Sequence, residues 1–166
     1  MLRYVYGQDE LVARAVAQLI PHVRNYGFHK EAKAIGVIDE EGRLIGGLVY
    51  HNYDPEAGTI EISGAATNPR WLNRGTIRRM YQYPFHICGC QMIFQRTPAD
   101  SVKLLSQLAA YDYTFIKVPR MFGRERDGVL CILTYEDWCA NRFNQRFKHH
   151  EITIPDLNEL TQEEAA

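Results

Sequence analysis

The sequence predicts a domain of the α+β class, in which antiparallel strands come first and helices alternate with strands later. Residues 34 to 39 and 44 to 53 are two strand-like runs joined by the glycine-containing turn 40 to 43, a pattern typical of a hairpin. A second turn at residues 54 to 58 leads into a third run at 59 to 67. Three successive strands are therefore expected to be antiparallel neighbours.

The first strand and the first helix come before the hairpin. Leu2 to Tyr6 predicts the strand, and apolar residues with helical spacing predict a helix from about Asp9 to the vicinity of Pro21. The predicted apolar face of this helix consists of Leu11, Val12, Ala15, Val16, Leu19 and Ile20. A second helix follows the third run, with one face marked by Ile77, Met80, Tyr81 and Phe85. Pro84 is expected to kink or shorten it, because proline lacks the amide that a helix needs.

The next strand and helix are marked by their junction. A strand over residues 90 to 96 is followed by Thr97, Pro98 and Asp100, which are typical of an N-cap and a first helical turn. We expect the helix to occupy residues 98 to 110.

A strand pair and a helix complete the pattern. Residues 115 to 118 and 129 to 134 predict the strands, which surround a polar loop flanked by glycines. Thr134 and Asp137 then predict the start of a last helix, which is expected to reach about His149.

Composition and charge narrow the classes of function. With 166 residues, the chain is expected to form one domain over residues 1–150, followed by an acidic tail over 151–166. The formal net charge of −1 argues against broad adhesion to nucleic acid or to a membrane. No apolar run approaches the roughly 18 residues of a membrane span. Four cysteines in mostly apolar surroundings, and an N-terminus without a secretory pattern, predict a reducing, cytoplasmic setting.

One run contains residue types that bind metals in other proteins, namely His86, Cys88 and Cys90. Its H-x-C-x-C spacing lacks the paired C-x-x-C of structural zinc sites. We therefore expect buried thiols here and no metal.

The most informative feature is a strand that passes through a basic turn into a helix. Residues 59 to 67 form the strand, Asn73, Arg74 and Gly75 lie in the turn, and the helix is expected to open at Thr76. Backbone amides at a helix start lack intrahelical acceptors and bind phosphate well. The turn also gathers arginines, namely Arg70, Arg74, Arg78 and Arg79. The first two are expected to meet phosphates, whereas the last two are equally compatible with solvated helix positions.

The order of elements and this turn resemble the GNAT family of acetyl-CoA-dependent N-acetyltransferases, over most of residues 1 to 138. In that family the strand is commonly followed by a segment like H-P-x-Y-R-G-x-G-x-G, whose amides hold the pyrophosphate of coenzyme A. Here the corresponding run is NPRWLNRGTI, residues 68 to 77, in which a proline, an aromatic residue, an arginine and the central glycine match. Leu72 replaces the usual Arg or Gln, and Ile77 replaces the last small residue. The chain looks most like small GNAT-like proteins of bacteria and their tailed phages.

The resemblance implies a fold, a coenzyme and a set of contacts. The fold is a three-layer α/β arrangement with a central mixed, mostly antiparallel sheet flanked by helices, here with an extra C-terminal helix. The coenzyme is acetyl-CoA, used as co-substrate. The residues expected to contact it are Ala65, Ala66, Thr67, Arg70, Leu72, Asn73, Arg74, Gly75, Thr76, Ile77, Asp100 and Lys103. Bulk at Ile77 is expected to crowd the pyrophosphate, because glycine there permits close backbone approach.

The resemblance also implies that an acceptor amine attacks the thioester directly. Such a reaction needs a base for the ammonium proton, amides for the oxyanion and an acid for the leaving thiolate. Ala65 and Ala66 are the candidates for placing the amides, and Glu61 or His51 is the candidate base.

The acid is less clearly marked. The family marker is an Asn at a helix start, a Tyr eight residues later and a Gly-Phe pair beyond, and the residues in those places are Asp100, Leu108, Asp112 and Tyr113. Tyr111 or Tyr113 is therefore the candidate acid. Both tyrosines are also compatible with packing at a strand edge, Glu61 with an ion pair, and His51 with a structural role.

Two other functions stay open at this point. One is a GNAT-fold protein without catalysis that serves as a binding or structural module. The other is nucleic-acid binding through the arginines and Trp71, which the near-zero net charge disfavours. The last predicted helix carries Phe143 and Phe147, which are expected either to cover the domain's own core or to contact a partner, such as a second copy.

Overall fold

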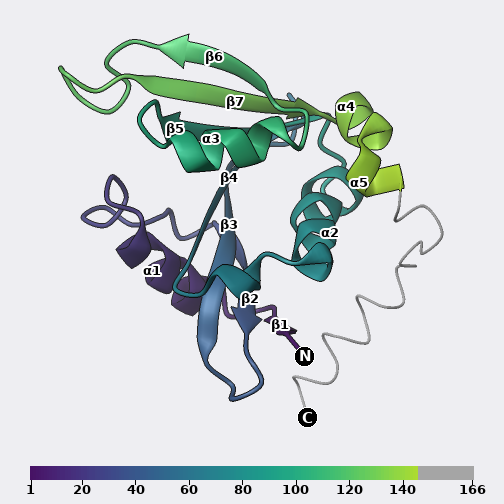
Figure 1. Ribbon diagram of the computed structural model, residues 1–166. Helices are drawn as coiled ribbons and strands as arrows, with labels where there is room; N and C mark the ends of the chain where they lie inside the picture. Colours follow the sequence, from purple (N-terminus) through teal and green to yellow (C-terminus); the bar gives the residue numbers. More distant parts are fainter. Residues whose placement is uncertain (146–166) are drawn as a thin grey trace. The chain divides into compact units, whose positions relative to one another are not determined.

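Within residues 1–145, the part of the chain that the computed structural model describes, strands form a seven-stranded sheet of order β1-β2-β3-β4-β5-β7-β6 (Figure 1). The strands are β1 Arg3–Val5, β2 Lys33–Ile38, β3 Leu44–Asp54, β4 Thr59–Ala66, β5 Met92–Pro98, β6 Thr114–Val118 and β7 Gly128–Thr134. The neighbours β4 and β5 are parallel, whereas the pairs β1–β2, β2–β3, β5–β7 and β6–β7 are antiparallel. The predicted hairpin and the predicted final strand pair are both confirmed.

Helices flank the sheet, as the predicted fold class requires. They are α1 Asp9–Leu19, α2 Arg74–Gln82, α3 Val102–Ala109, α4 Tyr135–Ala140 and α5 Arg142–Gln145. A 3₁₀ turn, Pro69–Trp71, precedes α2, and a π-helical segment, Tyr83–Ile87, follows it. Regular α-helix thus ends just before Pro84, as the missing proline amide predicts.

The chain divides into two units. The first comprises residues 1–51 and 63–78, and the second comprises 52–62 and, within the described part, 79–145. The single domain over residues 1–150 stays a prediction. The expected tail and the expected end of the last helix lie outside the described residues.

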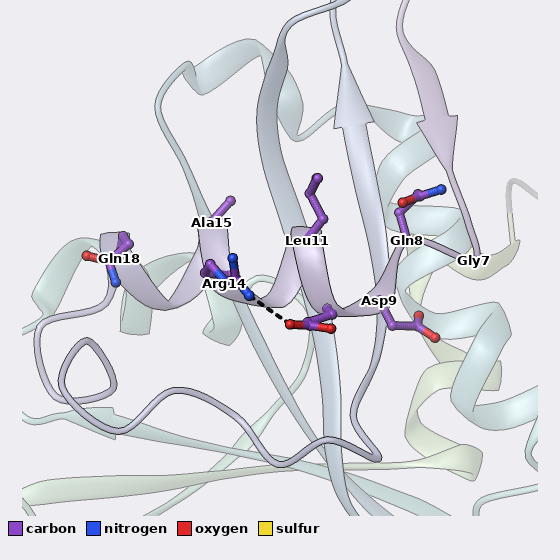
Figure 2. A pocket seen from close by; sticks show the side chains of 8 residues that line it. Gly7, Gln8, Asp9, Leu11, Arg14, Ala15 and Gln18 are labelled. Atoms are coloured by element: carbon purple, nitrogen blue, oxygen red, sulfur yellow. Dashed lines mark hydrogen bonds and ion pairs between the residues drawn. The ribbon is translucent and has the colours of Figure 1, made fainter.

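In the first unit, α1 packs on β2 through a face that differs from the predicted one (Figure 1). Its buried residues are Val12, Ala13, Val16 and Ala17. Leu11 is 60% exposed and Leu19 is 40% exposed, so these two residues of the predicted apolar face lie outside the buried one. Figure 2 shows Leu11 and Ala15 among the side chains that line a pocket along α1, together with Arg14, which forms an ion pair with Glu10.

Two glycines explain which face of α1 is buried. Gly36 and Gly47 are register partners on β2 and β3. A Cβ at Gly47 would lie 2.8 Å from Val12 Cγ1 and 2.9 Å from Val16 Cγ2. The absence of side chains at these glycines lets the helix approach the strands closely, and this approach buries the valine face.

Replacing Gly47 by alanine should therefore overpack this contact. We expect Gly47→Ala to lower the free energy of unfolding by about 1–3 kcal/mol in urea denaturation. Adding Val12→Ala should recover part of the loss, because it removes one of the colliding methyl groups. Full stability of Gly47→Ala alone would contradict this account of the helix packing.

The second unit is built around aromatic side chains. Tyr81 is fully buried, with its ring centroid 4.4 Å from that of Trp138, 6.1 Å from Tyr111 and 6.4 Å from Tyr113. Phe143 adds an edge contact to Tyr111 at 5.0 Å. The residues of the predicted helical face on and after α2 are buried, since Ile77, Met80, Tyr81 and Phe85 are all at most 7% exposed.

The predicted start of the helix after β5 was wrong. Thr97 and Pro98 belong to β5, because they continue its ladder opposite Val129 and Gly128 of β7. The helix α3 begins only at Val102. By contrast, the start of α4 is confirmed, since the Thr134 hydroxyl accepts a hydrogen bond from the Asp137 amide at 3.2 Å.

Candidate functional site

The segment between β4 and α2 carries the predicted phosphate turn and lies entirely in the first unit. The Asn68 side chain caps the 3₁₀ turn by accepting a hydrogen bond from the Arg70 amide at 3.0 Å. The Trp71 ring lies against the strands, since a Cβ at Gly46 would be 3.0 Å from it and one at Gly64 would be 3.1 Å from it. Trp71 therefore anchors the turn to the sheet.

Asn73 caps α2, which begins at Arg74, two residues before the predicted start. Its Oδ1 accepts hydrogen bonds from the Thr76 amide at 3.0 Å and from the Tyr4 hydroxyl at 3.1 Å. The Thr76 hydroxyl donates to the Trp71 carbonyl. One first-turn amide is thus satisfied within the protein, and the turn is held by side chains from β1 and from its own residues.

The central glycine of the turn has an internal explanation. A Cβ at Gly75 would lie 2.6 Å from the Tyr4 hydroxyl. The match of Gly75 to the family motif therefore also reflects the close approach of Tyr4.

The side chains of the turn divide between surface and core. Arg70, Asn73 and Arg74 are exposed. Ile77 is only 6% exposed, so its bulk fills the interior instead of crowding the surface of the turn. Leu72 is half-buried.

The end of β4, where oxyanion amides were expected, is partly engaged with its neighbours. Ala65 packs against the apolar cluster beneath α1. The Thr67 amide donates to the Ile45 carbonyl at 2.9 Å. Ala66 lies close to Gly46, because a Cβ on that glycine would be 2.6 Å from the Ala66 Cβ.

His51, one candidate base, lies in the first unit near the end of β3. It is 8% exposed, and its Nε2 lies 2.9 Å from the Ser63 hydroxyl oxygen. The Phe28 ring centroid is 4.9 Å from that of the imidazole. Ser63 is half-buried and therefore more open to solvent than the histidine.

Glu61, the other candidate base, lies in the second unit and is 3% exposed. Its Oε1 accepts a hydrogen bond from Arg96 Nε at 2.8 Å, and its Oε2 accepts one from Asn52 Nδ2 at 2.7 Å. Each carboxylate oxygen therefore already has a protein donor, in line with the alternative interpretation of Glu61 as part of an ion pair.

The candidate acids, Tyr111 and Tyr113, belong to the aromatic cluster of the second unit. They are 5% and 6% exposed, and burial raises the pKa of both hydroxyls. Gln95 Nε2 donates to the Tyr113 hydroxyl at 3.1 Å. This placement agrees with a packing role for both tyrosines.

Asp100 and Lys103 lie beside the start of α3 in the second unit, where they line a shallow hollow. Asp100 accepts hydrogen bonds from Arg126 Nε at 3.2 Å and Nη2 at 3.0 Å, and the hydrogen bonding lowers the pKa of its carboxyl. Lys103 is exposed.

The run His86, Cys88 and Cys90 contains two free thiols. Cys90 is buried and Cys88 half-buried, and burial raises the pKa of the Cys90 thiol to about 11. Within residues 1–145, three or more His, Cys, Asp or Glu side chains do not gather into a group that could hold a metal ion.

Over the same range, each helix is too short or too polar to cross a membrane.

Comparison with solved structures identifies the fold. Mutant forms of the spermidine/spermine N-acetyltransferase SpeG from Vibrio cholerae match at 16% identity and a TM-score of 0.60, over 68% of this chain and 70% of that one. A chimera of Vibrio cholerae SpeG and hSSAT matches at 14% identity and a TM-score of 0.66, over 85% of this chain and 98% of that one. A dodecameric form of the Vibrio cholerae enzyme matches at 16% identity and a TM-score of 0.58, over 66% and 68%. The chain has the GNAT fold.

Sequence comparison adds nothing to this assignment. Searches against protein-family models and against curated proteins found no match. Within the second unit, a parallel ladder joins Thr59, Ile60 and Glu61 of β4 to Met92, Ile93 and Phe94 of β5.

In this version of the GNAT fold, the candidate residues separate into two sets. The turn, Ala65, Ala66, Thr67 and His51 belong to the first unit, whereas Glu61, Asp100, Lys103, Tyr111 and Tyr113 belong to the second. The first set combines an exposed basic turn with a histidine–serine pair.

Two residues that support the turn, Tyr4 and Gly64, were missed by the sequence interpretation, and Asn73 was predicted as a coenzyme contact but not as an N-cap. Tyr4 lies in β1 and Gly64 in β4, and the position of neither residue in the sequence indicates a contact with the turn. The N-cap role of Asn73 had a signal, because asparagine is a preferred residue directly before the first residue of a helix, here Arg74.

Proposed function

We propose that this chain is an acetyl-CoA-dependent N-acetyltransferase. In the proposed reaction the acceptor amine attacks the thioester carbon, the carbon–sulfur bond breaks, coenzyme A leaves as a thiolate and a base takes the ammonium proton. The observation that carries the proposal is the exposed basic turn between β4 and α2 in a GNAT fold.

The coenzyme contacts in the proposal begin at this turn. Arg70 and Arg74 are exposed beside the start of α2, where the helix dipole also favours negative charge. Because the Thr76 amide donates to Asn73 Oδ1, the proposed pyrophosphate contacts centre on the exposed side chains of Arg70 and Arg74. Ala65 and Ala66 stay the proposed source of oxyanion amides.

The base in the proposal is His51. The proton would pass through the half-buried Ser63 hydroxyl, which lies 2.9 Å from His51 Nε2. Glu61 is the weaker candidate, because Arg96 and Asn52 occupy its two oxygens. Tyr111 and Tyr113 stay the predicted acids, and Tyr111→Phe and Tyr113→Phe test them in the same assay.

The proposal also covers the acceptor amine, self-association and the cellular compartment. The matched enzymes are named for spermidine and spermine, so these polyamines belong in an acceptor panel together with amine-bearing small molecules and peptides. Their dodecameric form makes self-association a reasonable expectation here. A reducing cytoplasm would suit acetyl-CoA chemistry and the free thiols.

The substitution Asn73→Asp tests coenzyme binding at the turn. Aspartate is a good N-cap and keeps the acceptor for the Thr76 amide, so the thermal midpoint should be equal to or above that of the parent. Its added charge should repel the pyrophosphate and weaken coenzyme A binding by about tenfold or more in calorimetric titration.

Gln8→Glu serves as the matched control, because it adds the same charge at the start of α1. This control should leave the affinity for coenzyme A unchanged. If Asn73→Asp binds coenzyme A as tightly as the parent does, the turn is not the pyrophosphate site.

A second candidate function is a GNAT-fold binding module without catalysis. The engaged oxygens of Glu61 and the burial of Tyr111 and Tyr113 favour it. Coenzyme A binding without acetyl transfer to any amine in the panel would support this alternative.

A further inference from the structure

The hydroxyl of Tyr4 reaches from β1 to the turn that precedes α2. It donates to Asn73 Oδ1 at 3.1 Å and lies 3.2 Å from the Thr76 hydroxyl oxygen. Asn73 lies 69 positions after Tyr4 in the sequence, so this contact links the first strand to the turn.

Three groups of the turn converge on this hydroxyl. The Asn73 acceptor that Tyr4 contacts is the same atom that caps the Thr76 amide. Thr76 is fully buried, and its own hydroxyl donates to the Trp71 carbonyl. The space in front of Gly75 is filled by the Tyr4 oxygen, 2.6 Å from where a Cβ would be. The Tyr4 hydroxyl therefore helps to fix the position of the first turn of α2.

We propose that Tyr4 is a positioning residue for the pyrophosphate of the coenzyme, acting through Asn73 and Thr76. This inference rests on the proposed function. A hydrogen bond to a cap residue restricts the cap's rotation, and a preorganised turn loses less entropy when it binds an anion. Tyr4 keeps the turn and the exposed Arg74 in the arrangement that meets the phosphates without touching the ligand itself.

The proposal predicts a loss that is specific to the phosphate part of the ligand. Tyr4→Phe keeps the ring and removes the hydroxyl, so coenzyme A should bind about three- to tenfold more weakly in calorimetric titration. Pantetheine, which lacks the phosphates, should bind equally to the parent and to the variant in competition measurements. If the substitution loosened the fold in general, the binding of coenzyme A and of pantetheine would weaken by the same factor. That result would overturn the proposal.

A matched control and a second variant test whether the effect is specific to the Tyr4 hydroxyl. Tyr6→Phe removes a hydroxyl two residues further along the chain and should leave both affinities unchanged. Gly75→Ala should weaken coenzyme A binding in the parent but have little added effect in Tyr4→Phe, because the colliding oxygen is gone. Simple additivity of the two substitutions would count against the proposed contact.

Failure of this inference is distinguishable from failure of the proposed function. If the parent binds coenzyme A and Tyr4→Phe binds it equally well, the positioning role is wrong and the proposed function stands. If the parent does not bind coenzyme A, both are wrong.

Discussion

Replacing His51 by glutamine is expected to lower kcat for acetyl transfer by about 10²-fold or more, the usual effect of losing a general base. Glutamine keeps a polar side chain of similar size beside Ser63 but cannot take up the ammonium proton. The measurement is the initial rate of thiol release from acetyl-CoA with a saturating amine. Because the base acts after binding, the affinity for coenzyme A should change little.

Glu61→Gln provides the comparison that assigns the base. It keeps the shape of the side chain but weakens the ion pair with Arg96, so its main effect should be on stability. A rate loss in Glu61→Gln together with an unchanged rate in His51→Gln would reverse the assignment. Ser63→Ala should resemble His51→Gln if the hydroxyl relays the proton.

Tyr81→Ala is expected to be the most destabilising substitution in the second unit, with a loss of about 3–5 kcal/mol in the free energy of unfolding. The side chain is fully buried, and its ring contacts those of Trp138, Tyr111 and Tyr113. Its removal leaves a cavity that these large rings cannot fill by small shifts.

Denaturant unfolding followed by tryptophan fluorescence measures this loss directly. Leu104→Ala on α3 is a control, because Leu104 is 39% exposed and should lose far less stability. A Tyr81→Ala protein as stable as the Leu104 control would contradict the account of the second unit as an aromatic core.

The sequence predicted the strands well because their signals are local. Alternation, turn glycines and the order of elements gave the hairpin, the final strand pair and the fold class. The face of α1 was not predictable in this way. Leu11 and Leu19 fit a helical stripe as well as Val12 and Val16 do, and the choice between them depends on Gly36 and Gly47 in distant strands.

The site was predicted in part for the same reason. The basic turn was visible as a local pattern of arginines and a glycine. The contact of Tyr4 with Gly75 and the pairing of Glu61 with Arg96 join residues far apart in the sequence, so no spacing rule reveals them. The start of α3 was misplaced because the ladder between β5 and β7 holds Thr97 and Pro98 in a strand, overriding their local preference for a helix start.

The most direct test of the acetyltransferase proposal is to incubate the full chain with acetyl-CoA and a panel of amines, including spermidine, and to record acetylated products by mass spectrometry. The account predicts a product that carries one added acetyl group on nitrogen, with an equal amount of free coenzyme A, for at least one amine. Asn73→Asp should form less of this product at low acetyl-CoA concentration. Tight binding of coenzyme A with no acetylated amine in the whole panel would contradict the proposed catalysis.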